Sequence, residues 1–143
     1  MKNSAPLSNF LGMCDAVVAG PAMSDGKAAS KVTGHLLRLC HAQLVLDAAM
    51  LMYLVSHADR LRSLAHPSVL TPHIGALAAM LACDADEIEQ NRLSAVKKAS
   101  SRFGAVCVLK GATSLSAAPG GDAFAYAGGG VGLPGGEDDR QSR

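Results

Sequence analysis

Four short apolar runs, separated by helix-like stretches, constrain the fold of this chain more than any other feature. The runs cover residues 16–19, 44–46, 68–70 and 105–109, and each ends at small or polar residues. A buried parallel strand is continuously apolar, and strands that alternate with helices imply parallel pairing through right-handed crossovers. The sequence therefore predicts an α/β fold with a mostly parallel sheet flanked by helices.

The stretches between the runs carry apolar residues at helical spacing. They predict helices over 28–40, 51–64 with a break near His57, 74–81 and 86–103. The expected caps are Ser24 or Asp25 for the first helix and Asp84 for the last, which Gly104 ends. After Lys110 the pattern changes, and two short runs at 115–118 and 123–127 flank Pro119-Gly120-Gly121-Asp122, which predicts a C-terminal β-hairpin.

Length and composition narrow the class of protein. The 143 residues predict one domain or one piece of a larger domain, with enough hydrophobic residues (49%) for a core. A net charge of +1 gives no electrostatic basis for binding nucleic acid. The apolar stretch from Leu44 to Val55 is too short to span a bilayer, and no continuous apolar segment marks a secretory signal. These features predict a cytoplasmic protein without membrane contact.

The cysteines and most histidines do not form a recognisable metal site. The four cysteines lack CxxC spacing, which argues against a zinc site or a redox dithiol, and they lie in or beside apolar runs: Cys14, Cys40, Cys83 and Cys107. They are therefore expected to be buried structural thiols. Four histidines without ligand-like spacing are expected at the surface or in packing: His35, His41, His57 and His66. No metal ligand is predicted.

The ends of the predicted strands carry the candidate functional residues. In an open α/β sheet, ligands bind at the carboxyl ends of the strands. Two segments stand at the ends of the last two runs and together predict a nucleotide or substrate cleft: Thr71-Pro72-His73-Ile74-Gly75 and Val108-Leu109-Lys110-Gly111-Ala112-Thr113. Gly20 and Asp47 follow the first two runs. Each also has a purely structural alternative: a strand-to-helix turn for Gly20, a helix N-cap for Asp47, a cap or core-edge role for His73 and a solvated strand end for Lys110.

Four segments together resemble a known family. Ala16 to Pro21, Val45 to Leu51, Val69 to Gly75 and Val106 to Thr113 occur in the order of motifs in the ADP/ATP-dependent NAD(P)H-hydrate dehydratases. These enzymes are part of the ribokinase-like carbohydrate kinase superfamily. The resemblance covers roughly residues 14–133 and implies a partial ribokinase-like three-layer fold. Residues 1–13 and 134–143, which lie outside it, are expected to be disordered ends.

The resemblance also implies an activity and a site. The family is a lyase that uses ADP or ATP and Mg²⁺ to convert (S)-NAD(P)H hydrate to NAD(P)H, by phosphorylating the ring hydroxyl before elimination, and a homo-oligomer is expected. It implies substrate contact by Gly20 and His73, and a phosphate or metal region at Asp47. The implied nucleotide-binding residues are Lys110, Gly111, Ala112, Thr113 and Ser114.

The chain departs from the family pattern at several positions. Family aspartate, proline and glutamate positions hold Ala49, Ile74 and Ala76. The catalytic Gly-x-Gly-Asp motif is not found, because Gly130-Val131-Gly132-Leu133 leads into a polar tail. No catalytic residue is therefore assigned, and a truncated or frame-shifted copy with impaired activity is expected. The alternatives are a non-catalytic nucleotide-binding fragment and a related vitamin-precursor kinase.

Overall fold

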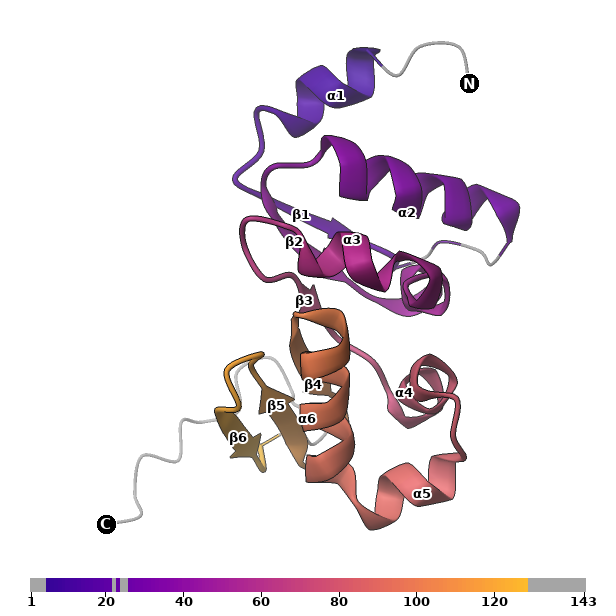
Figure 1. The fold of residues 1–143 in the computed structure, drawn as a ribbon, viewed down its shortest axis with the longest axis vertical. Coiled ribbons are helices and arrows are strands. Elements are labelled where there is room, and N and C mark those ends of the chain that lie inside the picture. The colour runs from indigo at the N-terminus through magenta and orange to yellow at the C-terminus, as the bar shows by residue number, and fades with distance from the viewer. Residues whose placement is uncertain (1–4, 22, 24–25, 129–143) are drawn as a thin grey trace.

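The computed structural model describes residues 5–21, 23 and 26–128, and Figure 1 shows how their elements are arranged. The helices are α1 (Ala5–Leu11), α2 (Lys27–Leu39), α3 (Ala58–Arg62), α4 (Ile74–Leu81), α5 (Ala85–Gln90) and α6 (Arg92–Phe103). Two 3₁₀ helices, η1 (Ala48–Tyr53) and η2 (Val55–His57), precede α3. The strands are β1 (Ala16–Ala19), β2 (Gln43–Leu46), β3 (Val69–Leu70), β4 (Val106–Leu109), β5 (Ser114–Ala117) and β6 (Ala123–Tyr126).

The strands form one six-stranded sheet in which spatial order follows chain order, from β1 to β6. Strands β1 to β4 pair in parallel, and β5 and β6 add an antiparallel hairpin to the β4 edge. The predicted mostly parallel sheet and the C-terminal hairpin are both confirmed. Although β3 has only two residues, its register of Val69 with Val45 and Val106 places it in the middle of the sheet.

The strand order places the crossover helices on one face of the sheet. Successive right-handed crossovers between neighbouring parallel strands, all advancing in one direction, pass over the same face. In Figure 1, α3 and α6 lie in front of the strands. Within the described residues, the molecule therefore has two layers of the expected three-layer arrangement, the sheet and one layer of helices.

The two faces of the sheet differ in burial, as this arrangement requires. The residues that point towards the helices are at most 2% exposed and form the core: Leu44, Leu46, Leu70, Cys107 and Leu109. On the opposite face, which carries the alternate residues of each strand, Val18, Phe124 and Tyr126 are 64%, 72% and 67% exposed. The sheet thus presents an apolar surface that no described helix covers.

Two predicted helices are interrupted in the structure. The expected continuous helix over 86–103 is two helices, because Asn91 has non-helical angles of φ −138° and ψ 51°. Asn disfavours helix interiors because its side chain competes for backbone hydrogen bonds. The stretch after Asp47 is η1, η2 and the short α3, with the expected break near His57.

Disorder was expected at both chain ends, but the structure describes only part of the N-terminal one. Residues Ala5–Leu11 form α1, and Leu11 is only 3% exposed within the hydrophobic core, so disorder does not extend over all of 1–13. An apolar anchor of this kind orders a chain end by burial. The expected cap at Ser24 or Asp25, the tail 134–143 and Gly130 to Leu133 lie outside the described residues.

The predicted helix signals at Asp84 and Gly104 are confirmed. Asp84 and Glu87 form a capping box at the start of α5. Gly104 ends α6 in the left-handed region at φ +57°, where a Cβ would approach the Arg62 side chain to 2.7 Å.

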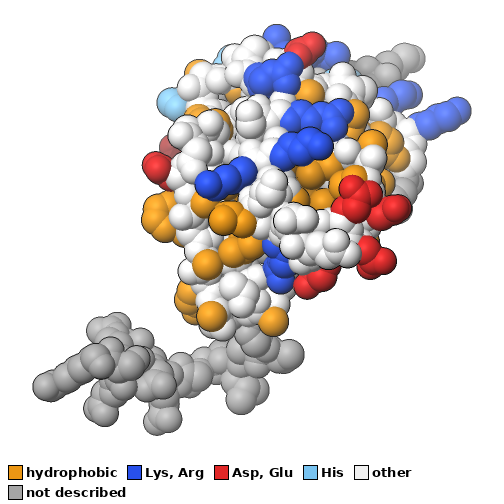
Figure 2. All heavy atoms as spheres, turned by 60° about the horizontal axis from the view of Figure 1, so that its bottom comes forward, with side chains coloured by type: hydrophobic (Ala, Val, Ile, Leu, Met, Phe, Trp, Pro, Cys, Tyr) orange, Lys and Arg blue, Asp and Glu red, His pale blue; other side chains and the backbone are white. Residues whose placement is uncertain are grey.

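Figure 2 shows one face of the molecule, on which basic, acidic and hydrophobic side chains are intermixed.

Candidate functional site

The backbone ladder of the sheet continues past the strands and gathers the candidate residues at one edge. Three amide-to-carbonyl hydrogen bonds connect the ends of neighbouring strands: Asp47 N to Ala19 O at 2.9 Å, Thr71 N to Leu46 O at 3.1 Å and Lys110 N to Pro72 O at 2.9 Å. The carboxyl ends of β1 to β4 are therefore in register. This arrangement confirms that the four strand ends meet, as the sequence predicts for an open α/β sheet.

Gly20 allows the first two strand ends to touch. Its φ is +124°, and a Cβ built there would lie 1.7 Å from the backbone carbonyl oxygen of Asp47. A left-handed backbone favours glycine, and the contact excludes any side chain. The absence of a side chain at Gly20 thus lets its backbone pack directly against the backbone of Asp47.

Asp47 and Lys110 form an ion pair across the edge. Lys110 Nζ donates to Asp47 Oδ1 at 2.9 Å, and the two side chains are 46% and 25% exposed respectively. Asp47 occupies the N-cap position of η1, but its side chain makes no cap hydrogen bond with the following turn. The ion pair, which joins residues 63 positions apart, takes the place of the expected cap.

The surroundings of Asp47 favour its ionised form. Burial raises the pKa of the Asp47 carboxyl, but the hydrogen bond from Lys110 lowers it, and so do the nearby Ala48 amide, the Thr71 side chain and the charge of Lys110. The net result is a pKa below the ordinary value. Asp47 is therefore a carboxylate at neutral pH, fixed beside a cation.

His73 serves as the cap of α4. Its Nδ1 accepts a hydrogen bond from the Ala76 amide at 3.2 Å, which confirms the capping alternative. Gly75 leaves room for the ring, since a Cβ there would lie 3.1 Å from His73 Cε1. Because Nδ1 accepts, a neutral ring carries its proton on Nε2, and no hydrogen bond to Nε2 is found among the described residues.

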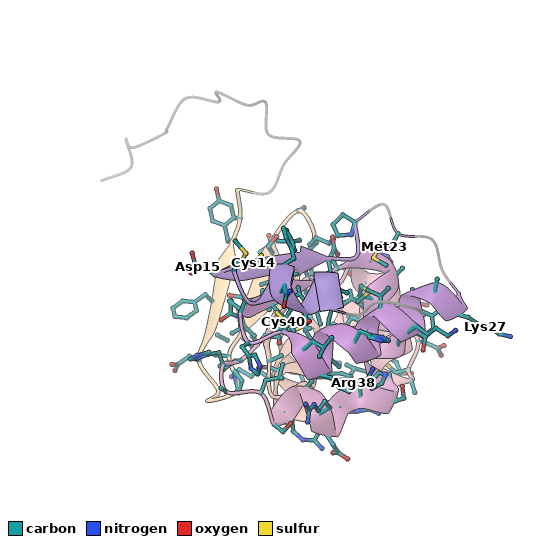
Figure 3. All side chains as sticks on the ribbon, turned by 90° about the horizontal axis from the view of Figure 1, so that it is seen from above. Cys14, Asp15, Met23, Lys27, Arg38 and Cys40 are labelled. Atoms are coloured by element: carbon teal, nitrogen blue, oxygen red, sulfur yellow. The ribbon has the colours of Figure 1, made fainter. Side chains whose placement is uncertain are left out.

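A cavity of about 530 Å³ lies beside His73. Its lining comes from the loop after β1, from η1 and from the start of α4: Met23, Ala48, Ala49, Met52, His73, Gly75 and Ala76. Figure 3 shows Asp15 and Met23 at opposite ends of β1. The candidate residues lie at the Met23 end. The lining is mainly apolar, and Ala76 stands where the family pattern has a carboxylate.

The loop Lys110–Ser114 forms a second part of the site. Lys110, Gly111 and Ala112 are exposed, while Thr113 and Ser114 are half-buried. The Ser114 hydroxyl donates to Gly111 O at 3.5 Å across the loop. None of the five residues lines the His73 cavity. The structure therefore brings Gly20, Asp47 and Lys110 together. Ala48 and Ala49, which follow Asp47 in the chain, line the same cavity as His73.

Sequence reasoning missed two residues that act on this edge. Thr71 helps to lower the pKa of Asp47, and its hydroxyl donates to Leu46 O at 3.4 Å. Arg92 donates from Nη2 to Thr113 O at 2.7 Å. Arg92 carries a weak signal in the sequence, since a cation at the start of a helix is unfavourable. Thr71 lies in the motif Thr71-Pro72-His73-Ile74-Gly75, in which the resemblance implies a contact for His73 alone.

The cysteines and remaining histidines stay outside the site. Cys40 and Cys107 are buried as expected, and burial raises the pKa of the Cys107 thiol to about 12. Cys14 and Cys83 are only half-buried. Among the described residues, no group of three His, Cys, Asp or Glu side chains could hold a metal ion. No helix within the described ranges is long and apolar enough to cross a membrane.

A family model described as NAD(P)H-hydrate dehydratase (Carb_kinase) matches residues 1–139. The chain belongs to this family. The match extends beyond both ends of the range 14–133 on which the motifs were found.

Curated relatives carry names from the same family. The ADP-dependent (S)-NAD(P)H-hydrate dehydratase of Xanthomonas campestris is 32% identical over 128 residues, which are 89% of this chain and 42% of that protein. The bifunctional NAD(P)H-hydrate repair enzyme Nnr of Escherichia coli is 34% identical over 112 residues, 78% of this chain and 21% of that protein. The chain thus spans less than half the length of these relatives.

Solved structures extend the likeness to the fold. The ADP/ATP-dependent NAD(P)H-hydrate dehydratase of Bacillus subtilis, co-crystallised with ATP and Mg²⁺, has a TM-score of 0.66 at 25% identity over 79% of this chain and 39% of that one. The hydroxyethylthiazole kinase of Pyrococcus horikoshii has a TM-score of 0.61 at 20% identity, covering 89% and 50%. The ribokinase-like fold is confirmed.

Proposed function

We propose that this chain carries substrate and nucleotide contacts for the ADP- or ATP-dependent dehydration of (S)-NAD(P)H hydrate to NAD(P)H. The supporting observation is the single strand-end edge on which Gly20, Asp47 and Lys110 are in contact, beside the cavity that His73 lines. Gly20 and His73 would face the hydrated dinucleotide. Lys110, Gly111, Ala112, Thr113 and Ser114 would bind ADP or ATP.

His73 would orient the substrate through Nε2, because the Ala76 amide already occupies Nδ1. A neutral imidazole held in one tautomer offers a donor in a fixed position. The apolar lining from Met23, Ala48 and Met52 would exclude water around the nicotinamide ring. In this proposal, the cavity supplies shape and one directed hydrogen bond.

Lys110 would bind nucleotide phosphate by exchanging Asp47 for a phosphate oxygen. Its exposed ammonium group can reach solvent without leaving the ion pair, and lysine binds phosphate as a point charge. Mg²⁺ needs only one or two carboxylates when nucleotide phosphates supply the other oxygens. Asp47 fits that limited role, and an ion bound there with the nucleotide would neutralise phosphate charge.

We also propose that turnover is impaired in this chain. The family's Gly-x-Gly-Asp motif would stabilise the transferring phosphoryl group and activate the attacking hydroxyl, and this sequence has Gly130-Val131-Gly132-Leu133 instead. That observation favours a nucleotide-binding fragment without catalysis as the second candidate function.

Calorimetry and a turnover assay with the same preparation separate these proposals. We expect ADP with Mg²⁺ and hydrated NADPH to bind, and we expect little recovery of the absorbance of reduced nicotinamide from hydrated NADH. Lys110→Met should weaken the binding of ADP but not of hydrated NADPH, and His73→Asn should weaken the binding of hydrated NADPH but not of ADP. Failure of both ligands to bind would overturn the proposed function, whereas rapid turnover would overturn only the impairment.

The open sheet face supports a proposal about assembly. Val18, Phe124 and Tyr126 are exposed on it, and β1 and β6 leave edges for further pairing. We expect the isolated chain to self-associate or to be poorly soluble. A monomer in sedimentation experiments, with a sharply cooperative melt, would contradict this expectation.

A further inference from the structure

Arg92 stands where its charge does not help its own helix. It is the first residue of α6, at the positive end of the helix dipole. A cation is unfavourable there, so its position calls for a partner outside the helix. The side chain is half-buried, and its Nη2 donates to the carbonyl oxygen of Thr113, 21 residues away, at 2.7 Å.

The same guanidinium group packs against Gly111. A Cβ built on Gly111 would lie 2.7 Å from Arg92 Nη2 and 3.5 Å from Arg92 Cζ. Arg92 therefore touches the loop Lys110–Ser114 at two points, the backbone of Gly111 and the carbonyl of Thr113. Arg92 Nε is buried and has no hydrogen-bond partner in the described part of the chain. Leaving a buried donor unsatisfied is unfavourable, which indicates that contact with the loop fixes the side chain in place.

The loop is also held from the opposite side. Lys110 Nζ bonds Asp47 at the end of β2, and Lys110 N bonds Pro72 O at the end of β3. These contacts fix the first residue of the loop, whereas Arg92 acts on its middle. The rigid planar fork of arginine suits this task, because it can pack flat against backbone while a nitrogen donates in its plane.

We propose that Arg92 is a positioning residue that preorganises the loop Lys110–Ser114 for nucleotide phosphate. The proposal rests on the proposed function for the identity of the ligand, but the contact with the loop does not depend on it. A loop already held in its binding conformation loses less freedom when a ligand arrives. Arg92 would thereby strengthen nucleotide binding without touching the nucleotide.

Native-state trypsin cleavage of the Lys110–Gly111 bond measures the loop directly, because cleavage follows local opening. We expect Arg92→Ala to accelerate cleavage at this bond by about tenfold or more, and Arg92→Lys to lie between Arg92→Ala and wild type. Arg102→Ala is the matched control: Arg102 is also a half-buried arginine of α6, and its Nη1 bonds Met80 O at 3.1 Å, away from the loop. It should leave cleavage at Lys110 unchanged.

Gly111→Ala provides a second route to the same contact and keeps the charge of Arg92. The added methyl group would displace the guanidinium, so cleavage should accelerate in the wild-type background. In the Arg92→Ala background it should have little further effect, and this non-additivity identifies the contact. Additive effects, unchanged cleavage in Arg92→Ala, or equal acceleration in Arg102→Ala would each overturn the proposal.

Titration with ADP and Mg²⁺ completes the test. We expect Arg92→Ala to weaken ADP about tenfold while hydrated NADPH binds as in wild type, a split that general destabilisation would not produce. Equal weakening of both ligands would overturn the positioning role. If wild type binds no ADP, the proposed function fails, and the cleavage rates still decide whether Arg92 holds the loop.

Discussion

The two corners of the strand-end edge are held by different forces. At one corner, Gly20 lies against the backbone of Asp47, which pairs with Lys110. At the other, His73 caps α4 beside an apolar cavity. The first corner tolerates no added atom between two backbones, whereas the second needs only a hydrogen-bond acceptor at the right place. The comparison indicates that the space between two backbones restricts the residue at position 20 to glycine. Position 73 instead requires a side chain that can accept a hydrogen bond.

The largest expected effect is at Gly20. Gly20→Ala should lower the free energy of unfolding by about 3 kcal/mol, since it combines a positive φ with a Cβ 1.7 Å from Asp47 O. Urea denaturation measures the loss. Gly26→Ala is the control, because Gly26 has a similar φ of +131° and open space around a Cβ. Gly26→Ala should lower the free energy of unfolding by only about 1 kcal/mol. Equal losses in the two variants would show that backbone strain alone, without the contact to Asp47, explains the effect of Gly20→Ala.

The next effect is at His73. His73→Ala should lower the free energy of unfolding by about 1 kcal/mol, because the Ala76 amide loses its acceptor. His73→Asn should retain most of that stability, since asparagine is a good N-cap residue. If both variants unfold at the same urea concentration, the cap does not stabilise α4. If His73→Asn still binds hydrated NADPH as wild type does, the imidazole has no role in binding.

The smallest effect on stability is at the ion pair. Asp47→Asn and Lys110→Met should each change the free energy of unfolding by less than about 1 kcal/mol, because both side chains are partly exposed. High salt should reduce the difference from wild type. A loss as large as that of Gly20→Ala would show that charge, rather than backbone contact, holds this corner.

The ion pair also predicts a dependence on pH. The pKa of Asp47 is lowered in the folded state, so its contribution is fully present above the unfolded pKa and is lost as pH falls through the folded pKa. Urea midpoints measured from about pH 5 to about pH 2 should fall more in wild type than in Asp47→Asn. Lys110→Met should show the same reduced dependence, and parallel curves for all three proteins would contradict the assignment.

Local patterns were sufficient to predict much of the fold. The continuously apolar runs gave the four parallel strands, and Pro72 with His73 placed the start of α4 at Ile74. The break at Asn91 was missed because the helices on both sides keep helical spacing, so periodicity alone predicts one helix. The short, interrupted helices after Asp47 depend on packing that a local pattern does not encode.

The candidate site was predictable at the level of residues but not of contacts. Strand-end reasoning brought Gly20, Asp47 and Lys110 to one edge, but it did not predict the ion pair between residues 63 positions apart. The contact of Arg92 with Thr113 likewise joins two elements that only the folded sheet brings together. The motif at His73 indicated a functional loop, while its role as a cap depends on the orientation of the ring.

The agreement of strand order with chain order has a consequence for how this molecule is assembled. Each new parallel strand joins the edge left by the strand before it, so every step from β1 to β4 pairs with chain that is already in place. Such a sheet can grow during synthesis from the ribosome without waiting for a distant segment. Its parallel pairings also have short sequence separation for their class, which favours rapid folding.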